Sequence, residues 1–172
     1  HNRCRRQRQM CIRDSNKALR WASLYGNHLV VDLLLRVQGI NDADVRTRGN
    51  DALQMASKEG YHLVVDLLLQ VPGILADDVR ANDNLALKNA SESGHVAVVD
   101  RLLRVPDINA DDVRAEDNHA LKHASMEGHV AVVHLLLQVL GAGDVRNAEA
   151  LTLASMEGHD EVAVSYTHLR AH

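Results

Sequence analysis

The sequence ALKNASESGHVAVVDRLL, residues Ala86 to Leu103, recurs along the chain in recognisable form. Its glycine belongs to a series spaced by 34 residues, with a last interval of 30: Gly26, Gly60, Gly94, Gly128 and Gly158. An alanine and a leucine stand eight and seven residues before each glycine, and another alanine stands four before it. Periods of this length are typical of repeat proteins. Five units therefore begin, near residues 16, 50, 84, 118 and 147, and the last is incomplete.

Each unit has the pattern of two short helices that meet at the glycine. In the second unit, Leu53 and Ala56 fall on one face of the first helix, and Gly60 ends that helix because glycine tolerates a left-handed conformation. The second helix, roughly His62 to Val71, is so rich in Val and Leu that neighbours must cover it on both sides. An asparagine stands two residues before the first alanine in four units and three before it in the fifth: Asn16, Asn50, Asn84, Asn118 and Asn147. We expect these asparagines to be helix N-caps.

A long polar connector joins each unit to the next, for example Pro72 to Asp83. Its proline ends the preceding helix, and its Asp and Asn residues favour turns. A period of 34 is also that of tetratricopeptide repeats, but those spend nearly the whole period on two longer helices. The sequence therefore predicts an all-α solenoid of turn-and-two-helix units with long polar connectors.

The run Ala86 to Leu103 resembles the ankyrin-repeat signature Thr-Pro-Leu-His-x-Ala-Ala-x-x-Gly-His-x-x-Val-Val-x-Leu-Leu-Leu. The resemblance covers about residues 16–161. In every unit Ala replaces the signature's Pro and Ser replaces its second Ala, and the connector is about one residue longer than usual. The resemblance implies that the histidines after the glycines (His95, His129 and His159) tie the turn between helices to a neighbouring backbone.

The resemblance also implies a scaffold that binds a partner protein on a concave face, made by the connector tips and the exposed side of each first helix. Two sets of positions on that face vary among units that share one framework, and variation there can carry specificity. The first-helix set is Trp21, Met55, Asn89 and His123. Trp21 is the best anchor candidate, and the alternative is that it caps the core of the first unit. The tip set is Arg48, Asn82 and Glu116. The alternative is that these residues vary only because exposed positions tolerate substitution.

Charge and composition argue against nucleic acids and membranes as partners. Residues 16–161 contain 13 Lys and Arg against 22 Asp and Glu, a formal charge of −9, which repels the phosphates of nucleic acids. The apolar runs are too short to cross a membrane, and no secretory signal region precedes the repeats. We expect a soluble, cytoplasmic protein without a cofactor or small-molecule substrate. A structural spacer, or a fragment of a larger protein whose activity lies elsewhere, is the alternative function.

Metal binding and catalysis have weaker support. His119 and His123 are spaced to share a metal on one helix, but no third ligand accompanies them at metal-site spacing. The pairs Asp77-Asp78 and Asp111-Asp112 could bind calcium, yet the pattern of an EF-hand is missing, and Asp–Arg pairing is the simpler explanation. A serine recurs at the same packing position in every unit, and we call these residues the framework serines: Ser23, Ser57, Ser91, Ser125 and Ser155. A catalytic site needs only one nucleophile, so a serine repeated in every unit indicates packing. The sequence therefore predicts that the protein is not an enzyme.

The two ends share an unexpected relationship. If Met10 to Asp14 is written ATG TGT ATA AGA GAC, the opposite strand encodes the residues Val164 to His168. Such an inverted repeat, in frame at both ends, resembles translated sequencing-adapter sequence. We therefore expect residues 1–15 and 162–172 to be non-native tails, the first without fixed structure, and the second helix of the fifth unit to stop after Val162. A basic arm that binds nucleic acid is the alternative for the first tail. Both cysteines lie in that tail.

Overall fold

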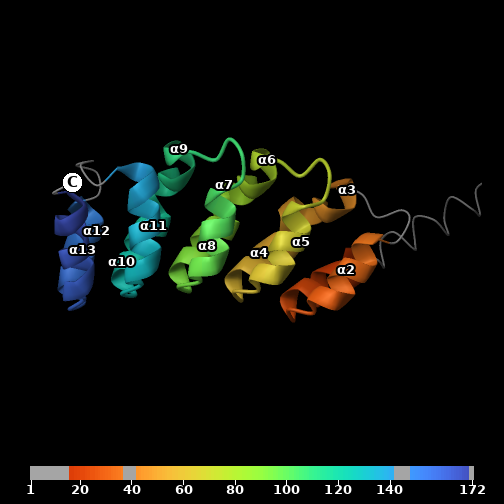
Figure 1. Cartoon of the computed structure of the whole chain (residues 1–172), viewed down its shortest axis with the longest axis horizontal. Coiled ribbons are helices and arrows are strands. Elements are labelled where there is room, and N and C mark those ends of the chain that lie inside the picture. The colour runs from red at the N-terminus through yellow and green to blue at the C-terminus, as the bar shows by residue number, and fades with distance from the viewer. Residues whose placement is uncertain (1–15, 37–41, 142–147, 171–172) are drawn as a thin grey trace, which may run out of the picture.

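The computed structural model describes residues 16–36, 42–141 and 148–170. The regular structure of these residues is helical, which confirms the predicted all-α solenoid. The units stand side by side in chain order, and short connector helices lie along one edge of the stack (Figure 1). The first helices are residues 16–24, α4 (Thr47–Lys58), α7 (Ala81–Glu92), α10 (Ala115–Met126) and α12 (Ala148–Met156). The second helices are α2 (His28–Arg36), α5 (His62–Leu69), α8 (Val96–Leu103), α11 (Val130–Leu140) and α13 (Asp160–Arg170). The connector helices are α3 (Asp42–Val45), α6 (Ala76–Val79) and α9 (Ala110–Val113).

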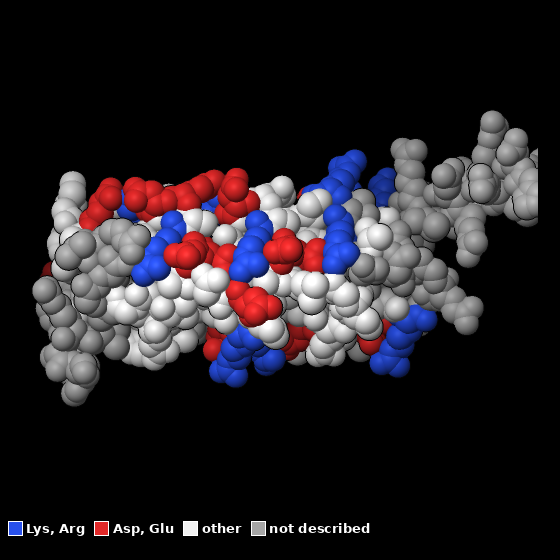
Figure 2. Space-filling view, turned by 90° about the horizontal axis from the view of Figure 1, so that it is seen from above, with Lys and Arg blue, Asp and Glu red and all other residues white. Residues whose placement is uncertain are grey.

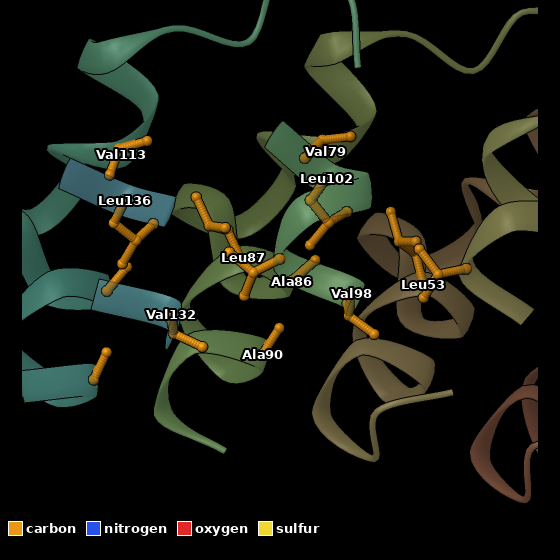
Figure 3. Close-up of a cluster of buried hydrophobic side chains, with 14 of the residues drawn as sticks. Leu53, Val79, Ala86, Leu87, Ala90, Val98, Leu102, Val113, Val132 and Leu136 are labelled. Carbon is orange, nitrogen blue, oxygen red and sulfur yellow. The ribbon is translucent and has the colours of Figure 1, made fainter. Parts of the chain in front are cut away.

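The constant residues of the repeat form one continuous core. In the third unit, Leu87 is 1% exposed, and Ala90, Val98 and Leu102 are 0% exposed. Figure 3 shows these side chains between α7 and α8 and their equivalents in the neighbouring units. Alanine on the first helices allows close approach, while Val and Leu on the second helices fill the space between units, as the dense packing of protein interiors requires. The core therefore runs the length of the stack.

Two of the three predicted histidine contacts are seen directly. The ring of His95 lies over Gly60, and its Nε2 is 2.9 Å from the carbonyl oxygen of Lys58 in the preceding unit. His129 repeats this arrangement over Gly94, with Nε2 3.0 Å from the carbonyl oxygen of Glu92. His159 likewise lies over Gly128. Because a Cβ on these glycines would meet the ring at about 2.5 Å or slightly more, glycine is required by the neighbour as well as by its positive φ.

The connectors contain more regular structure than the sequence predicted. The four-residue helix α9 is capped by Asp112, whose Oδ2 accepts the backbone N–H of Asn109 at 2.8 Å, and Asp78 caps α6 through Leu75 in the same way. Three successive left-handed residues then follow in each of three connectors. They are Arg48-Gly49-Asn50, Asn82-Asp83-Asn84 and Glu116-Asp117-Asn118, with φ between 50° and 67°. Asn and Asp tolerate this conformation better than most residues, which explains their abundance here.

The predicted role of the recurring asparagine as an N-cap is wrong for Asn50 and Asn84. Asn50 and Asn84 are themselves left-handed, with φ 66° and 60°, and they are 3% and 6% exposed. Their side chains point to the next unit instead. Asn50 Nδ2 donates to the backbone oxygen of Asp78 at 2.7 Å, and Asn84 Nδ2 donates to that of Asp112 at 3.1 Å. Asparagine suits both a helix N-cap and a left-handed backbone position. Here the buried hydrogen bond to a neighbouring backbone oxygen determines that it takes the left-handed position.

The last unit also differs from expectation. Its second helix does not stop after Val162, because α13 continues to Arg170. Val162 is 0% exposed, and Tyr166 is 6% exposed at the repeat position that Leu68, Leu102 and Leu136 occupy. Burial raises the pKa of the Tyr166 phenol to about 12. The assignment of residues 162–172 to a non-native tail stays a prediction, and residues 1–15 lie outside the described residues.

Candidate protein-binding face

The predicted first-helix residues occupy equivalent positions on neighbouring helices. We call Trp21, Met55, Asn89 and His123 the first-helix row; the helices that carry the last three, α4, α7 and α10, pack in this order. Trp21 is 50% exposed, and the other three side chains are half-buried. The core positions on the same helices, by contrast, are nearly or fully buried. The structure thus aligns the row along the stack and leaves it partly open to solvent.

The predicted tip residues lie at the first of the three left-handed positions. We call Arg48, Asn82 and Glu116 the tip row; all three are exposed, with φ 58°, 55° and 50°. Asn82 Nδ2 lies 3.4 Å from the backbone oxygen of Gly49, and its side chain covers that glycine. Glu116 pairs with Lys88 at 2.6 Å. The left-handed backbone and the contacts with a neighbouring unit therefore both restrict which residue types the tip row can contain.

A third set of residues on the first helices was missed by the sequence analysis. Lys88 Nζ reaches Glu116 of the next unit at 2.6 Å, and Lys122 Nζ reaches Glu149 at 2.8 Å. The hydrogen bond from Lys88 lowers the pKa of Glu116. Arg20 makes the equivalent contact with Asp51 at 3.0 Å. The signal was a basic residue directly after the constant leucine in three of the five units.

Acidic side chains gather at the tips of the later units. Figure 2 shows a row of them along one edge of the surface seen from above. Asp83, Glu116, Asp117 and Glu149 are all exposed. Lys88 and Lys122 lie against three of these carboxylates, and Asp117 pairs with Lys122 at 2.6 Å. Because there are four carboxylates and two lysines, this edge keeps a net negative charge.

His119 and His123 stack on α10, with ring centroids 4.1 Å apart. Burial lowers the pKa of His119, and the neighbouring charges of His123 and Lys88 lower it further. Among the described residues, no three His, Cys, Asp or Glu side chains lie together as a metal site would require. The two rings form a stacked pair, and one of them, His123, belongs to the first-helix row.

The connector aspartates pair with arginines, as the simpler explanation predicted. Arg80 Nε and Nη2 donate to Oδ1 and Oδ2 of Asp112 at 2.5 and 3.0 Å, and Arg46 binds Asp78 in the same way. Within one connector, Arg80 Nη1 also lies 3.1 Å from Asp77. The hydrogen bond from Arg80 lowers the pKa of Asp112, although burial of the carboxylate acts in the opposite direction. Basic and acidic side chains consequently alternate along the middle of the surface in Figure 2.

The framework serines lie where neighbouring units meet. Ser23, Ser57, Ser91 and Ser125 are 0% exposed, whereas Ser155 in the last unit is exposed. Their burial agrees with a packing role.

In the part of the chain that the structure describes, no helix is long and apolar enough to cross a membrane.

Comparison with known proteins agrees with this architecture. The sequence profile described as ankyrin repeats (3 copies) matches residues 19–112, which is more than half of the 172-residue chain. The match begins at the core leucine of the first unit and ends at Asp112 in the connector before the fourth. No curated protein matches the chain.

Proposed function

The chain belongs to the ankyrin-repeat family, and from this premise we propose that it binds a partner protein through the first-helix row and the tip row. Ankyrin repeats are generally protein–protein interaction modules and are typically not enzymes. The observation that carries the proposal is the alignment of Trp21, Met55, Asn89 and His123, partly exposed, along helices whose other faces form the core.

Trp21 is the proposed anchor. Its ring stacks on Tyr25 with centroids 5.7 Å apart, and the two side chains are 50% and 62% exposed. The two rings form an exposed aromatic surface in a chain with only one Trp and three Tyr. Trp and Tyr are enriched among the residues that dominate binding energy at protein interfaces. We infer that an apolar side chain of the partner packs against this pair.

The acidic tips suggest the charge of the partner. Asp83 and Asp117 are exposed, and the lysines nearby leave a net negative charge along the edge that Glu116 and Glu149 share. A basic segment of the partner would be steered toward this edge, and exposed charges act mainly on the association rate and its salt dependence. We therefore propose a partner segment that is apolar where it meets Trp21 and basic where it meets the tips of the third to fifth units. We also propose that the complex with this partner protein forms in the cytoplasm.

The proposal is tested by affinity purification with three forms of the full chain. The first is wild type, the second carries Trp21→Ala, Met55→Ala and His123→Ala, and the third carries Asp66→Ala and Arg101→Ala. Asp66 and Arg101 pair at 3.0 Å between α5 and α8, so the third form is a control on the second-helix side. A protein retained by wild type is then purified and its Kd measured by calorimetry.

We expect the triple variant to weaken binding by at least about tenfold, which corresponds to about 1.4 kcal/mol. The control should bind within about twofold of wild type. All three forms must keep the same helical circular dichroism. A partner that still binds the triple variant but loses affinity for the control would place the interface on the second helices and refute the proposal.

A further inference from the structure

Two histidines share one exposed side of α10. His119 and His123 lie about one turn apart, and their rings stack with centroids 4.1 Å apart. Nδ1 of the half-buried His119 is shielded from solvent and has no hydrogen-bond partner among the described residues. Two neutral imidazole rings can stack in this way, whereas two imidazolium ions at the same distance repel each other. The stacked arrangement is therefore that of a pair that carries fewer than two protons.

The contacts between other units show what normally stands at the position of His119. Arg20 on one first helix reaches Asp51 on the next at 3.0 Å, and Lys122 reaches Glu149 at 2.8 Å. The two basic residues directly follow the constant leucine of their units, and the two acidic residues directly precede the first constant alanine of theirs. Opposite charges at these matching positions give each pair of neighbouring helices a modest attraction.

Histidine replaces the carboxylate where the third unit meets the fourth. Lys88 directly follows its constant leucine, and His119 directly precedes its constant alanine. Lys88 is 7% exposed and pairs with Glu116 at 2.6 Å instead. Protonation of His119 would place like charges at positions where two other contacts between units have opposite charges. This contact is therefore the one at which a proton changes attraction into repulsion.

Charged groups on every helix packed around α10 affect the protonation of the pair. Besides Lys88, the groups near the exposed side are Glu92 on α7, Glu116 at the tip, Lys122 on α10, Glu127 at its end and Glu149 on α12. Of the other two helices packed on α10, α9 contains Asp111 and Asp112, which bind arginines, and α11 contains His134, which lies 3.3 Å from Gln138.

The balance of these groups favours a neutral His119. Burial lowers the pKa of His119, and the charges of His123 and Lys88 lower it further. Glu116 and Glu92 act in the opposite direction but only partly compensate. The electrostatic surroundings thus agree with the stacked geometry, because both keep the second proton off the pair.

We propose that the stacked His119–His123 pair makes partner binding at the third and fourth units sensitive to pH. This inference rests on the proposed function, in which His123 touches the partner and a basic segment lies against the acidic tips. In the neutral form the rings stay stacked and Glu116 stays with Lys88. In the doubly protonated form the rings separate, and protonated His119 competes with Lys88 for Glu116.

The direction of the effect follows from charge. Two protons add two positive charges to a face that binds a basic segment, so affinity falls as the pH falls. Histidine changes its charge between about pH 5 and pH 8, so the change occurs in that interval. Linkage requires the reciprocal effect as well: the bound partner makes the pair harder to protonate.

The first experiment needs no partner. NMR follows the histidine ring protons of the full chain from pH 8 to pH 4.5, and His119→Gln identifies the His119 signal. In His123→Gln and in Lys88→Met the midpoint of His119 should rise by about half a pH unit or more, because a neighbouring positive charge is gone. His62→Gln is the control, since His62 is exposed on α5 outside the first-helix row, and it should leave the midpoint unchanged.

The second experiment measures the Kd of the purified partner by calorimetry at pH 7.5 and pH 5.5, at constant ionic strength. For wild type and for His62→Gln, Kd should be at least about tenfold higher at pH 5.5. For the double variant His119→Gln, His123→Gln, the ratio of the two Kd values should stay within about threefold. Comparing ratios removes the loss of affinity that replacing His123 causes at both pH values.

Two results would overturn the proposal. A His119 midpoint that is the same in wild type, His123→Gln and Lys88→Met would show that neither neighbour opposes its protonation. Equal Kd ratios in wild type and the double variant would show that binding does not depend on the pair. Failure of the proposed function is distinguishable, because the triple variant at Trp21, Met55 and His123 would then bind like wild type, while the free chain would still show the shifted midpoints.

Discussion

Arg80 and Asp112 form a two-point contact between the connectors of adjacent units, with donor–acceptor distances of 2.5 and 3.0 Å. The same carboxylate accepts the backbone N–H of Asn109 at 2.8 Å and thereby caps α9. Arg46 and Asp78 repeat both features one unit earlier. A single aspartate therefore stabilises its own connector and fixes the distance to the preceding one.

Asp112→Ala should destabilise the protein by about 1–3 kcal/mol. The estimate lies between the values for exposed and buried ion pairs, because Asp112 has 8% and Arg80 33% of its side chain exposed. Urea denaturation measures the loss. Asp111→Ala is the control, because Asp111 is 91% exposed in its pair with Arg114 and should contribute less than about 0.5 kcal/mol. Equal losses for the two variants would show that the contact between units contributes nothing.

Acid should weaken the stack through these aspartates. The pKa values of Asp78 and Asp112 are lowered from 3.8, so each contributes stability that is fully present well above pH 3.8 and is lost as the pH falls through the lowered value. For Asp78, burial opposes ionisation, but hydrogen bonds from Arg46, Leu75 and Asn50 outweigh it. Stability measured from pH 6 downward should fall less steeply in Asp112→Asn than in wild type. The same slope in both would contradict this origin.

Substitutions at Asn84 should separate backbone conformation from hydrogen bonding. Asn84→Ala loses the bond to the oxygen of Asp112 and places an alanine at φ 60°, so it should cost about 2–3 kcal/mol. Asn84→Gly loses the same bond but tolerates that φ, so it should cost about 1 kcal/mol less than alanine. Thermal denaturation compares the two. Alanine as stable as glycine would show that the left-handed turn is not maintained in solution.

Ser91→Ala should stabilise the protein by about 0.5–1.5 kcal/mol. The Ser91 hydroxyl is fully buried and has no hydrogen-bond partner, and alanine is the better helix former. Ser155→Ala, at the exposed counterpart, should gain only the helix-propensity part of this effect. Chemical denaturation of both variants gives the difference. If Ser91→Ala lowers the free energy of unfolding below that of wild type, the Ser91 hydroxyl makes a stabilising hydrogen bond in solution.

The sequence predicted the part of the fold that depends on periodic packing. Ala90, Val98 and Leu102 recur with the glycine period and are buried, and His95 contacts the preceding unit as the family resemblance implied. The connectors were harder to predict, because asparagine suits both a helix N-cap and a left-handed residue. Asn84 takes the second role only because a backbone oxygen of the next unit, which the sequence does not place, lies within reach.

The positions of the residues on the candidate face could be predicted from the sequence, but their contacts with neighbouring units could not. The repeat frame placed Met55 and His123 at equivalent sites, and both are half-buried on the first helices. The pairing of Lys88 with Glu116 joins residues 28 positions apart, and it follows from the offset between stacked units. That offset depends on how closely the alanines let the helices approach, and no single-unit pattern specifies it.

Oxidative footprinting of the complex shows whether a partner covers the first-helix row. The row contains Trp21, Met55 and His123, whose side chains are readily oxidised, and Met156, 75% exposed and outside the row, serves as the internal control. With a purified partner bound, we expect all three residues to be oxidised several-fold more slowly, with the largest effect at Trp21, while the oxidation rate of Met156 stays unchanged. Unchanged oxidation of Trp21, Met55 and His123 in a saturated complex would contradict it.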